Sequence, residues 1–380
     1  MTPFLRYATG KQAEIVALIG EMVACESPSD APAAVNRLVD LLAERTRDIA
    51  TAETIAAEGF GKHLRLRFQL PGREKKRGRI LALGHSDTVW PLGTLKTMPF
   101  RETGGRLWGP GVLDMKAGLA FFIFAMRALR ELDIAVARDV VLLVVSDEEV
   151  GSTTSRPLIE AEAQHSDCVL VLEPGTGLTG KLKTARKGVG QYKVFIEGRA
   201  AHAGVDFENG ASAIIEAARQ VIQLAGFTDL ERGTTVNPGV IAGGTRTNVI
   251  AAEALVKVDI RVARLADAGV LDEKFRTLRP YDARCRIRVE GGLNRPPMER
   301  TPAIAELFAK ARELGSAMGI QVEESSTGGG SDGNFTAALG VPTLDGLGGV
   351  GEGAHATNES ILVDRIADRV ALLAGLVEQY

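Results

Sequence analysis

Cysteine is scarce in this sequence, and its scarcity excludes several kinds of protein. The 380 residues contain three cysteines, Cys25, Cys168 and Cys285, which are far apart and form no C-x-x-C pair. An odd and widely spaced set argues against a disulfide framework and against a zinc finger built from thiolates. We therefore expect a protein of a reducing compartment, most simply the cytoplasm.

Long apolar runs and long runs of one charge are absent as well. No stretch approaches the roughly 20 apolar residues of a membrane-spanning helix, and Met1–Lys11 lacks the pattern of a signal peptide. The formal net charge is −3, and the densest basic stretch, Arg73–Arg79, is predicted to be a solvated loop between strands. Because nucleic-acid binding depends on neutralising phosphates, we expect neither a nucleic-acid partner nor a membrane partner.

What the sequence does contain is the pattern of an α/β fold. Short continuous apolar runs, typical of buried parallel strands, occur at Arg79–Leu83, Val140–Val145 and Cys168–Leu172. A long apolar helix is predicted over Ala117–Leu132. The same α/β texture returns after Pro297, with helices over Ile304–Met318 and Val363–Tyr380 and a strand near Val341–Leu344.

Between these two parts the pattern changes to alternating, half-exposed strands. The predicted order is strand, helix, two strands, helix, strand, over Gln191–Gly198, Ala211–Ala225, Thr235–Ala242, Ala254–Ala263, Ala268–Leu278 and Arg284–Glu290. That order is the βαββαβ, ferredoxin-like sandwich. We predict one α/β domain with a mainly parallel sheet, over residues 1–187 and 297–380, and an inserted α+β domain over residues 188–296.

Acidic and imidazole groups recur where successive core strands end. His85 and Asp87 follow the first strand, Glu148 and Glu149 the second, and Glu173 the third, while Asp114 precedes the long helix. Ligands of open α/β sheets bind outside the carboxyl ends of the strands. Several carboxylates gathered there repel one another unless cations are present, and two histidines with several acids suit Zn²⁺. Of the adjacent pair, one glutamate can bind metal while the other acts as a general base.

Simpler explanations exist for each residue taken alone. A single acid after a strand is more often a helix cap or a first-turn charge, and a single histidine is more often a hydrogen-bonded boundary residue. The combination of His-x-Asp with a double glutamate at neighbouring strand ends favours a metal site.

Two other motifs compete with the metal site. The stretch Gly175–Lys181 resembles a phosphate-binding loop, but Leu182 stands where a Ser or Thr is required. Gly329–Gly333 fits the nucleophile elbow of a serine hydrolase around Ser331, followed by Asp345 and His355. The short separation of Ser331 from His355 disfavours that hydrolase. The glycine-rich turn, including Gly329 and Gly330, is instead expected to offer backbone N–H groups to an anionic substrate.

Taken together, the motifs resemble the co-catalytic zinc aminoacylase/carboxypeptidase family. The resemblance rests on six motifs that follow one another over residues 80–360: Gly84-His85-Ser86-Asp87-Thr88-Val89, Gly109-Pro110-Gly111-Val112-Leu113-Asp114-Met115-Lys116, Asp147-Glu148-Glu149-Val150-Gly151-Ser152, Glu173-Pro174, Arg199-Ala200-Ala201-His202-Ala203-Gly204 and Thr327-Gly328-Gly329-Gly330-Ser331-Asp332. The family includes acetylornithine deacetylase, succinyl-diaminopimelate desuccinylase and glutamate carboxypeptidase. The Ala-His-Ala-Gly segment and the triple glycine look most similar to the glutamate carboxypeptidase (carboxypeptidase G type) branch.

The resemblance implies two zinc ions, for which Co²⁺ can substitute, bridged by Asp114. By the same resemblance, His85 and Glu173 complete one metal site, and Glu149 and His355 complete the other. Asp87 is implied to orient His85, and Glu148 to be the general base. The inserted domain is implied to be a lid that also forms a homodimer. It is implied to supply His202, which acts on the scissile carbonyl, and Asn248 and Arg261, which bind the substrate carboxylate. Lys181 and Arg295 are implied to be further contacts to the substrate.

These residues predict metal-dependent hydrolysis of an amide bond to an amino acid with a free carboxylate. The substrate is expected to be a peptide or an N-acyl amino acid, most simply one cleaved by a glutamate carboxypeptidase. An N-acyl-amino-acid deacylase of the acetylornithine or succinyl-diaminopimelate type is the alternative, and a serine hydrolase using Ser331 is a remote one. A zinc-binding protein without catalytic activity would need neither Glu148 nor Arg261.

Overall fold

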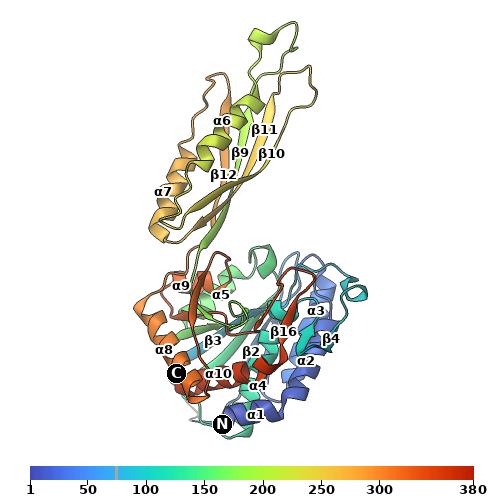
Figure 1. Cartoon of the computed structure of the whole chain (residues 1–380), viewed down its shortest axis with the longest axis vertical. Helices are drawn as coiled ribbons and strands as arrows, with labels where there is room; N and C mark the ends of the chain where they lie inside the picture. The colour runs from blue at the N-terminus through green and yellow to red at the C-terminus, as the bar shows by residue number, and fades with distance from the viewer. Residues whose placement is uncertain (73–75) are drawn as a thin grey trace. The chain divides into compact units, whose positions relative to one another are not determined.

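The computed structural model describes residues 1–72 and 76–380, which form two compact units (Figure 1). The larger unit comprises residues 1–185, 300–326 and 331–380, and the smaller unit comprises residues 186–299 together with 327–330. The predicted loop Arg73–Arg79 lies partly outside the described residues. The three cysteines are free thiols. Within the described part of the chain, no helix combines the length and the apolarity needed to cross a membrane.

The larger unit is built on a six-stranded sheet with the order β1-β2-β6-β3-β7-β14. Its strands are β1 (Ala50–Ile55), β2 (His63–Phe68), β3 (Arg79–His85), β6 (Asp139–Val145), β7 (Cys168–Val171) and β14 (Thr343–Leu344). β3 runs parallel to β6 and β7, and β14 runs parallel to β7. β1 and β2 are antiparallel additions beside β6 that the sequence pattern did not indicate.

Helices cover both faces of this sheet because successive residues of its central strands point to opposite sides. Leu81 and Leu83 of β3 lie in one apolar cluster with residues of α5 and α9, whereas Ile80 and Ala82 lie in a second cluster with residues of the other helices. The helices are α1 (Pro3–Gly10), α2 (Gln12–Ala24), α3 (Pro32–Thr46), α4 (Ala117–Glu131), α5 (Arg156–Gln164), α8 (Pro302–Ala317), α9 (Gly333–Ala338) and α10 (Ile366–Gln379). α4 is buried along nearly its whole length, as its apolar sequence predicts.

Two further sheets are smaller and are separate from the sheet of the smaller unit. One pairs β8 (Leu182–Arg186) with β13 (Glu324–Thr327). The other has the order β15-β16-β5-β4, with β4 (Arg101–Thr103), β5 (Arg106–Trp108), β15 (Gly351–Glu352) and β16 (Ser360–Leu362). The second sheet brings the C-terminal strands beside residues 101–108.

The smaller unit has the predicted βαββαβ order. Its elements are β9 (Gly188–Glu197), α6 (Ala213–Ala225), β10 (Thr235–Gly243), β11 (Glu253–Val262), α7 (Leu265–Arg276) and β12 (Arg286–Arg295). The sheet is antiparallel, with β10 and β12 at its edges. Alternate residues of β9, such as Tyr192 and Val194, are buried in the core with residues of both helices, and the ring of Tyr192 stacks on Phe275 of α7. The predicted fold class, a mainly parallel α/β domain with an inserted α+β domain, is confirmed.

Candidate metal centre

The strand register of the larger sheet brings the predicted metal ligands to one edge. His85, the last residue of β3, lies level with Val145 of β6, and Leu83 lies level with Val171 of β7. Glu173, two residues beyond Val171, therefore reaches the level of His85, and the turn after β6 carries Glu148 and Glu149 to the same edge. Ligand-capable atoms of His85, Glu148 and Glu173 lie within 4.8 Å of one another, as do those of His85, Asp114 and Glu149.

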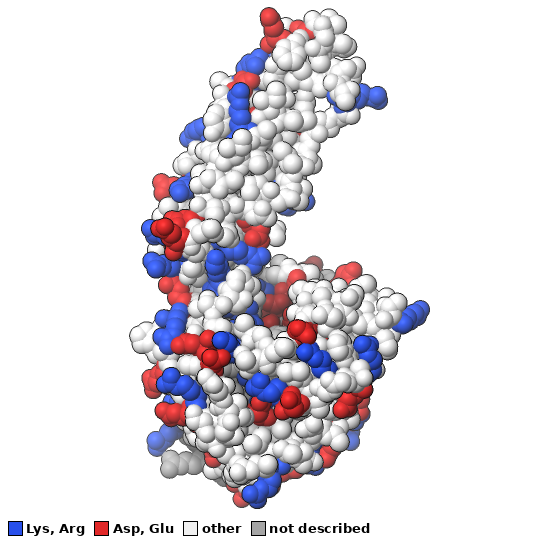
Figure 2. Space-filling view, viewed as in Figure 1, with Lys and Arg blue, Asp and Glu red and all other residues white. Residues whose placement is uncertain are grey.

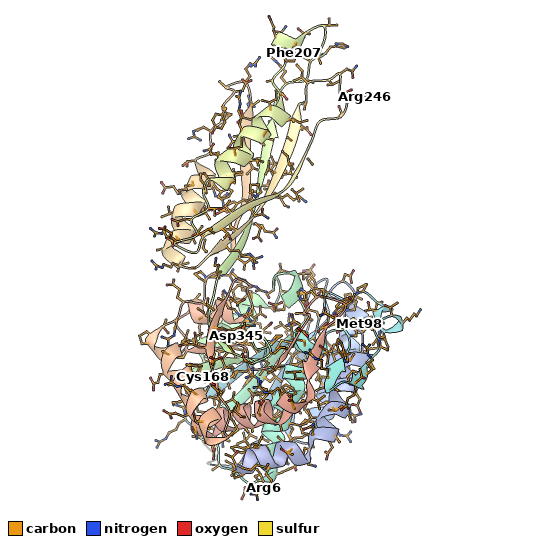
Figure 3. All side chains as sticks on the ribbon, in the orientation of Figure 1. Arg6, Met98, Cys168, Phe207, Arg246 and Asp345 are labelled. Atoms are coloured by element: carbon orange, nitrogen blue, oxygen red, sulfur yellow. The ribbon has the colours of Figure 1, made fainter. Side chains whose placement is uncertain are left out.

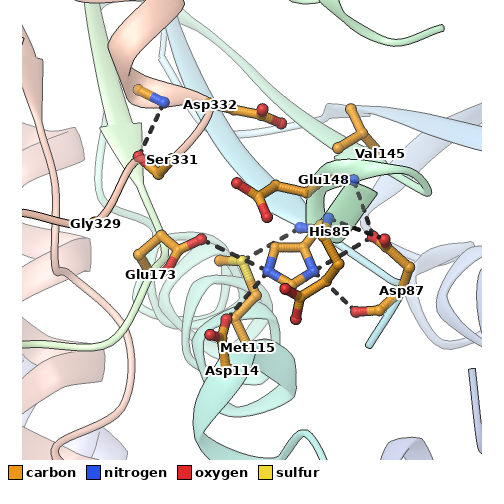
Figure 4. Close-up of polar contacts among 12 residues, drawn as sticks. His85, Asp87, Asp114, Met115, Val145, Glu148, Glu173, Gly329, Ser331 and Asp332 are labelled. Atoms are coloured by element: carbon orange, nitrogen blue, oxygen red, sulfur yellow. Dashed lines mark hydrogen bonds and ion pairs between the residues drawn. The ribbon is translucent and has the colours of Figure 1, made fainter. Parts of the chain in front are cut away.

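The imidazole of His85 is buried among carboxylates (Figure 4). Its Nε2 atom lies 3.2 Å from Oδ1 of Asp114 and 3.6 Å from Oε1 of Glu173. Its Nδ1 atom lies 2.9 Å from the carbonyl oxygen of Asp87 and 3.5 Å from Oδ1 of that residue. The Asp87 contacts leave Nε2 facing Asp114 and Glu173, the orientation that a second carboxylate imposes on a metal-binding histidine.

Asp114 directs its second oxygen to the other histidine. Oδ2 of Asp114 lies 3.4 Å from Nε2 of His355, and the same Nε2 lies 3.3 Å from Oε1 of Glu149. One carboxylate thus stands between two groups of donors. His85 and Glu173 are on the side of Oδ1, and His355 and Glu149 are on the side of Oδ2.

Asp87 is fully buried and makes more contacts than the predicted one to His85. Its carboxylate accepts hydrogen bonds from the backbone N–H groups of Glu148 and Glu149, at 3.3 and 3.2 Å, and from Oγ of Ser29 at 2.7 Å. Asp87 therefore fixes the turn that carries both glutamates. Ser29 has no sequence signal of this role, because it lies 58 positions away in a loop without metal-ligand spacing.

Charge in this cluster is balanced between buried carboxylates and imidazoles. Burial lowers the pKa of His85, but the carboxylates that hydrogen-bond to it outweigh burial and raise that pKa well above 6.5. Hydrogen bonds to Asp114 and Glu149 raise the pKa of His355 to about 10. Burial opposes ionisation of Asp114, yet the two histidines hold its pKa well below the usual range. The cluster therefore demands positive charge at its centre.

The donor set fits divalent cations. It offers two imidazoles and three carboxylates, which are nitrogen and oxygen ligands of the kind that Zn²⁺ accepts. Oε1 of Glu149 is buried and lies 3.3 Å from Nε2 of His355, so a carboxylate oxygen faces the centre of the cluster. Because metal binding displaces protons from such ligands, two cations can replace the imidazolium charge.

The glycine-rich turn before Asp114 is required by close packing. Gly111 has a φ of +70°, and a Cβ atom on it would lie 2.7 Å from Cγ2 of Thr88. The backbone N–H of Gly111, with those of Leu113 and Asp114, donates to the buried carboxylate of Glu359. Glu359 was not predicted, since nothing in its local sequence distinguishes it from an ordinary surface acid.

The smaller unit contains His202, which is predicted to be catalytic, and the predicted substrate-binding residues Asn248, Arg261, Arg295, Gly329 and Gly330. His202 and Asn248 are exposed and lie on adjoining segments, since the N–H of Ala203 donates to the carbonyl of Asn248 at 3.0 Å. Arg261 bonds to Asp259 through Nε at 2.9 Å and to the carbonyl of Gly328 through Nη1 at 3.1 Å. Arg295 is buried.

The turn at residues 327–330 is part of the smaller unit, and its carbonyl groups accept hydrogen bonds from other residues of that unit. The side chain of Arg186 donates to the carbonyl groups of Gly329 and Gly330, both at 3.1 Å. The backbone N–H of Lys187 donates to the carbonyl group of Thr327 at 2.9 Å. The N–H of Gly329 lies 3.3 Å from Oγ1 of Thr327. The hydrogen bonds from Arg186 to this turn were not predicted from the sequence.

The structure gives no support to the two competing motifs. Ser331 is fully buried and donates to Oδ2 of Asp345 at 2.7 Å, whereas His355 faces Asp114 and Glu149. The predicted phosphate-like loop ends at Lys181, whose ammonium lies 3.2 Å from Glu323, and it is followed by strand β8 instead of a helix. Neither arrangement provides a serine nucleophile with a histidine base or a phosphate-binding helix terminus.

An acid beyond the end of each of the strands β3, β6 and β7, with a carboxylate between two histidines, is an arrangement that can hold metal ions. The chain belongs to peptidase family M20/M25/M40, whose model matches residues 81–379. This confirms the resemblance seen in the motifs and makes the protein a hydrolase of a metal-dependent peptidase family. Three hundred and thirty-eight curated proteins match the chain at a significant level.

Two curated relatives and one solved structure illustrate the similarity. Carboxypeptidase G2 of Pseudomonas sp. (strain RS-16) is 32% identical over 317 residues, covering 80% of this chain and 75% of that protein. Succinyl-diaminopimelate desuccinylase of Dechloromonas aromatica is 27% identical, covering 95% of this chain and 97% of that protein. The crystal structure of aminopeptidase PepT from Bacillus cereus superposes with a TM-score of 0.79 at 24% identity, covering 97% of this chain and 98% of that one, which shows the common fold.

Proposed function

We propose that this protein is a dinuclear zinc hydrolase that cleaves the amide bond to an amino acid with a free carboxylate, as a glutamate carboxypeptidase does. The observation that carries the proposal is Asp114, whose two oxygens face His85 and His355 separately. The 32% identity to carboxypeptidase G2 supports the choice of substrate class. His85 and Glu173 would hold one cation, Glu149 and His355 the other, and Asp114 both.

When bound, two such cations would supply Lewis acidity and would lower the pKa of the attacking water toward about 7. Glu148 is the residue that takes the proton from the attacking water and delivers it to the leaving amine. A carboxylate oxygen of Glu148 lies within 4.8 Å of ligand-capable atoms of His85 and Glu173. The backbone N–H of Glu148 donates to the carboxylate of Asp87. Proton transfer by a positioned carboxylate contributes about 10²- to 10⁴-fold in rate.

The smaller unit is proposed to act as lid and dimerisation domain, supplying the groups that recognise the substrate. His202 would polarise the scissile carbonyl, and Asn248 and Arg261 would bind the carboxylate, with Arg295 and the Gly329–Gly330 turn as further contacts. Lys181, which belongs to the larger unit, would be another contact. Arginine is suited to this because its guanidinium binds a carboxylate through two parallel hydrogen bonds. We propose a cytoplasmic location because the cysteines are few and unpaired.

A deacylase is the second candidate function. Succinyl-diaminopimelate desuccinylase and acetylornithine deacetylase relatives are 27% and 28% identical, over 95% and 81% of this chain. They share the family and differ in the acyl group removed, so the two functions predict different substrates for one metal centre.

The deciding experiment measures amino-acid release from a substrate panel by metal-free and metal-restored protein. The panel is N-acyl-Glu, N-acyl-Asp, N-acetylornithine, N-succinyl-diaminopimelate and dipeptides, each with Zn²⁺ or Co²⁺. We expect activity only with added metal, highest on a substrate that releases glutamate. Preference for N-succinyl-diaminopimelate or N-acetylornithine would establish the deacylase, and full activity after exhaustive chelation would refute a metal-dependent reaction.

A further inference from the structure

Glu359 is a buried carboxylate to which the proposed reaction gives no task. Its side chain is 0% exposed, and each of its oxygens accepts two hydrogen bonds. Oε1 accepts from the backbone N–H groups of Leu113 at 2.9 Å and Asp114 at 3.1 Å. Oε2 accepts from the N–H of Gly111 at 2.9 Å and from Nε1 of Trp90 at 2.7 Å. Such charge-assisted bonds are strong in a buried setting.

These contacts join the three segments that carry the metal ligands around Asp114. Trp90 is three residues beyond Asp87, on the segment that begins with His85. Residues 111–114 carry Asp114 itself. Glu359 comes from the segment of His355, four residues later, and its own N–H donates to the carbonyl of Ala356 at 2.9 Å. One carboxylate therefore ties together segments separated by some 250 positions in the chain.

We propose that Glu359 is a positioning residue of the metal centre, which fixes the backbone of Asp114 so that its two oxygens face the two sets of ligands. The hydrogen bonds of the Glu359 carboxylate go to Trp90 and to the backbone of residues 111–114, so Glu359 acts through Asp114. The inference rests on the proposed metal-dependent function, and it adds a residue outside the ligand set to that function. Buried groups that orient metal ligands are often as important as the ligands themselves.

The arrangement requires a carboxylate and not merely a polar side chain. A glutamine has one acceptor oxygen, and its NH₂ group would face the other pair of N–H donors. Glu359→Gln therefore preserves size while leaving two donors of the four without an acceptor. Trp90→Phe removes a single donor and leaves the three backbone N–H donors in place, so it is a milder change to the same network.

The experiment compares metal affinity in wild type, Glu359→Gln and Trp90→Phe, with Glu352→Gln as the matched control. Glu352 lies on the same C-terminal segment, but its carboxylate pairs with Arg106 at 2.9 Å. Metal affinity is measured by chelator competition with Zn²⁺, and the visible spectrum of the Co²⁺ protein reports ligand geometry. We expect Glu359→Gln to bind metal about 10- to 100-fold more weakly, with a changed Co²⁺ spectrum.

Trp90→Phe is expected to lower affinity in the same direction by a smaller factor, while Glu352→Gln stays at the wild-type value. At saturating metal, Glu359→Gln should reduce kcat and leave KM within about twofold, because Glu359 does not bind substrate. Wild-type metal affinity and an unchanged Co²⁺ spectrum in Glu359→Gln would overturn the inference. A lower melting temperature of metal-free Glu359→Gln, together with wild-type affinity for metal, would also overturn it, because Glu359 would then only stabilise the fold.

If Glu359→Gln does not fold, Trp90→Phe decides the question, and wild-type affinity there overturns the inference. Failure of the proposed function has a different signature. In that case the wild-type protein itself would bind no divalent ion, whereas failure of the inference leaves wild-type binding intact.

Discussion

Single side chains decide the chemistry at the carboxyl edge of the larger sheet. The most informative is Asp114, because its two oxygens separate the surrounding donors into two groups. Glu148 and Glu149 are neighbours in sequence and yet are given different tasks, one as base and one as ligand. Each of these assignments can be tested by a single substitution.

Glu148→Gln should remove the general base without removing the metals. We expect kcat to fall by about 10²- to 10⁴-fold while metal content remains at the wild-type value. Elemental analysis and steady-state kinetics check this, with the surface residue Glu160, paired with Arg156, changed to Gln as control. Loss of one metal ion from Glu148→Gln would mean that this residue is a ligand and not the base.

Arg261→Ala should weaken substrate binding more than chemistry. Arg261 is proposed to hold a group that does not react, so KM should rise while kcat changes little. Arg284 is a matched control, because it also pairs with an aspartate two residues earlier in the same unit. Equal effects of Arg261→Ala and Arg284→Ala on KM would contradict the assignment of Arg261 to substrate.

His63 should make the stability of the larger unit depend on pH. It is buried against Ser146 and Thr154, and burial lowers its pKa below 6.5 although Asp147 and Asp87 oppose that shift. Below about pH 6.5 the unfolded chain takes up a proton that the folded chain binds less readily, so stability falls as the pH falls.

Urea unfolding of metal-free protein at several pH values between 7.5 and 5 measures this effect. This range brackets the ordinary pKa of histidine. As the pH falls, we expect the free energy of unfolding of His63→Asn to rise relative to that of wild type, because the variant lacks the His63 contribution. Exposed His165→Asn is expected to keep the wild-type pH dependence. A wild-type slope in His63→Asn would assign the pH dependence to other groups.

Among the elements, helix α4 packs closely against the backbone of Leu172, the residue that follows strand β7. Gly118 of α4 faces the carbonyl of Leu172, the residue before Glu173, and a Cβ atom on Gly118 would lie only 2.1 Å from that oxygen. A side chain cannot be accommodated there without moving backbone beside the metal centre. A helical glycine in open surroundings, Gly269 of α7, has nothing within 4 Å of such an atom.

The same substitution should therefore have opposite effects at the two glycines. Gly118→Ala is expected to destabilise the protein by about 1–3 kcal/mol through overpacking. Gly269→Ala is expected to stabilise it by about 0.5–1 kcal/mol, because alanine favours helix. Chemical unfolding of both variants tests the contrast, and a stabilising Gly118→Ala would show that α4 is not held against Leu172.

At the scale of the whole molecule, the smaller unit exposes apolar side chains that a monomer leaves in water. On α6 these are Ile214, Ile215 and Ile222, which is 75% exposed, and on the edge strand β10 they are Val240 and Ile241. Figure 2 shows few charged side chains over much of the visible face of this unit, and Figure 3 labels Phe207 and Arg246 on its loops. An unpaired edge strand beside an apolar helix is a typical self-association surface.

We expect the wild-type protein to be a homodimer through α6 and β10, in which the two copies use the same surface. Ile222→Glu should shift it toward monomer, as measured by light scattering during size-exclusion chromatography. Leu178→Glu, at a 47% exposed leucine of the larger unit, is the control and should remain dimeric. A monomeric wild type would contradict the dimer, and a dimeric Ile222→Glu would place the interface elsewhere.

The prediction of fold was most successful where burial dictates the sequence pattern. β3, β6 and β7 are buried on both faces and read as continuous apolar runs, and α4 is apolar all round. β1 escaped prediction because most of its residues are exposed and it lies at the sheet edge, where no apolar pattern is required. The short strand β14 was visible only as part of an apolar run.

The sequence alone determined which residues follow the central strands, and hence that His85, Glu148, Glu149 and Glu173 meet at one edge, because parallel strands end on the same side of a sheet. Only the tertiary structure decided how Asp114 is shared between His85 and His355, and that Glu359 and Ser29 hold the surrounding segments. The same is true of the bonds from Arg186 to the turn at residues 327–330 of the smaller unit. These contacts join parts of the chain that are far apart, and no local periodicity records them. Their geometry exists only when the segments pack together and their buried polar groups must find partners.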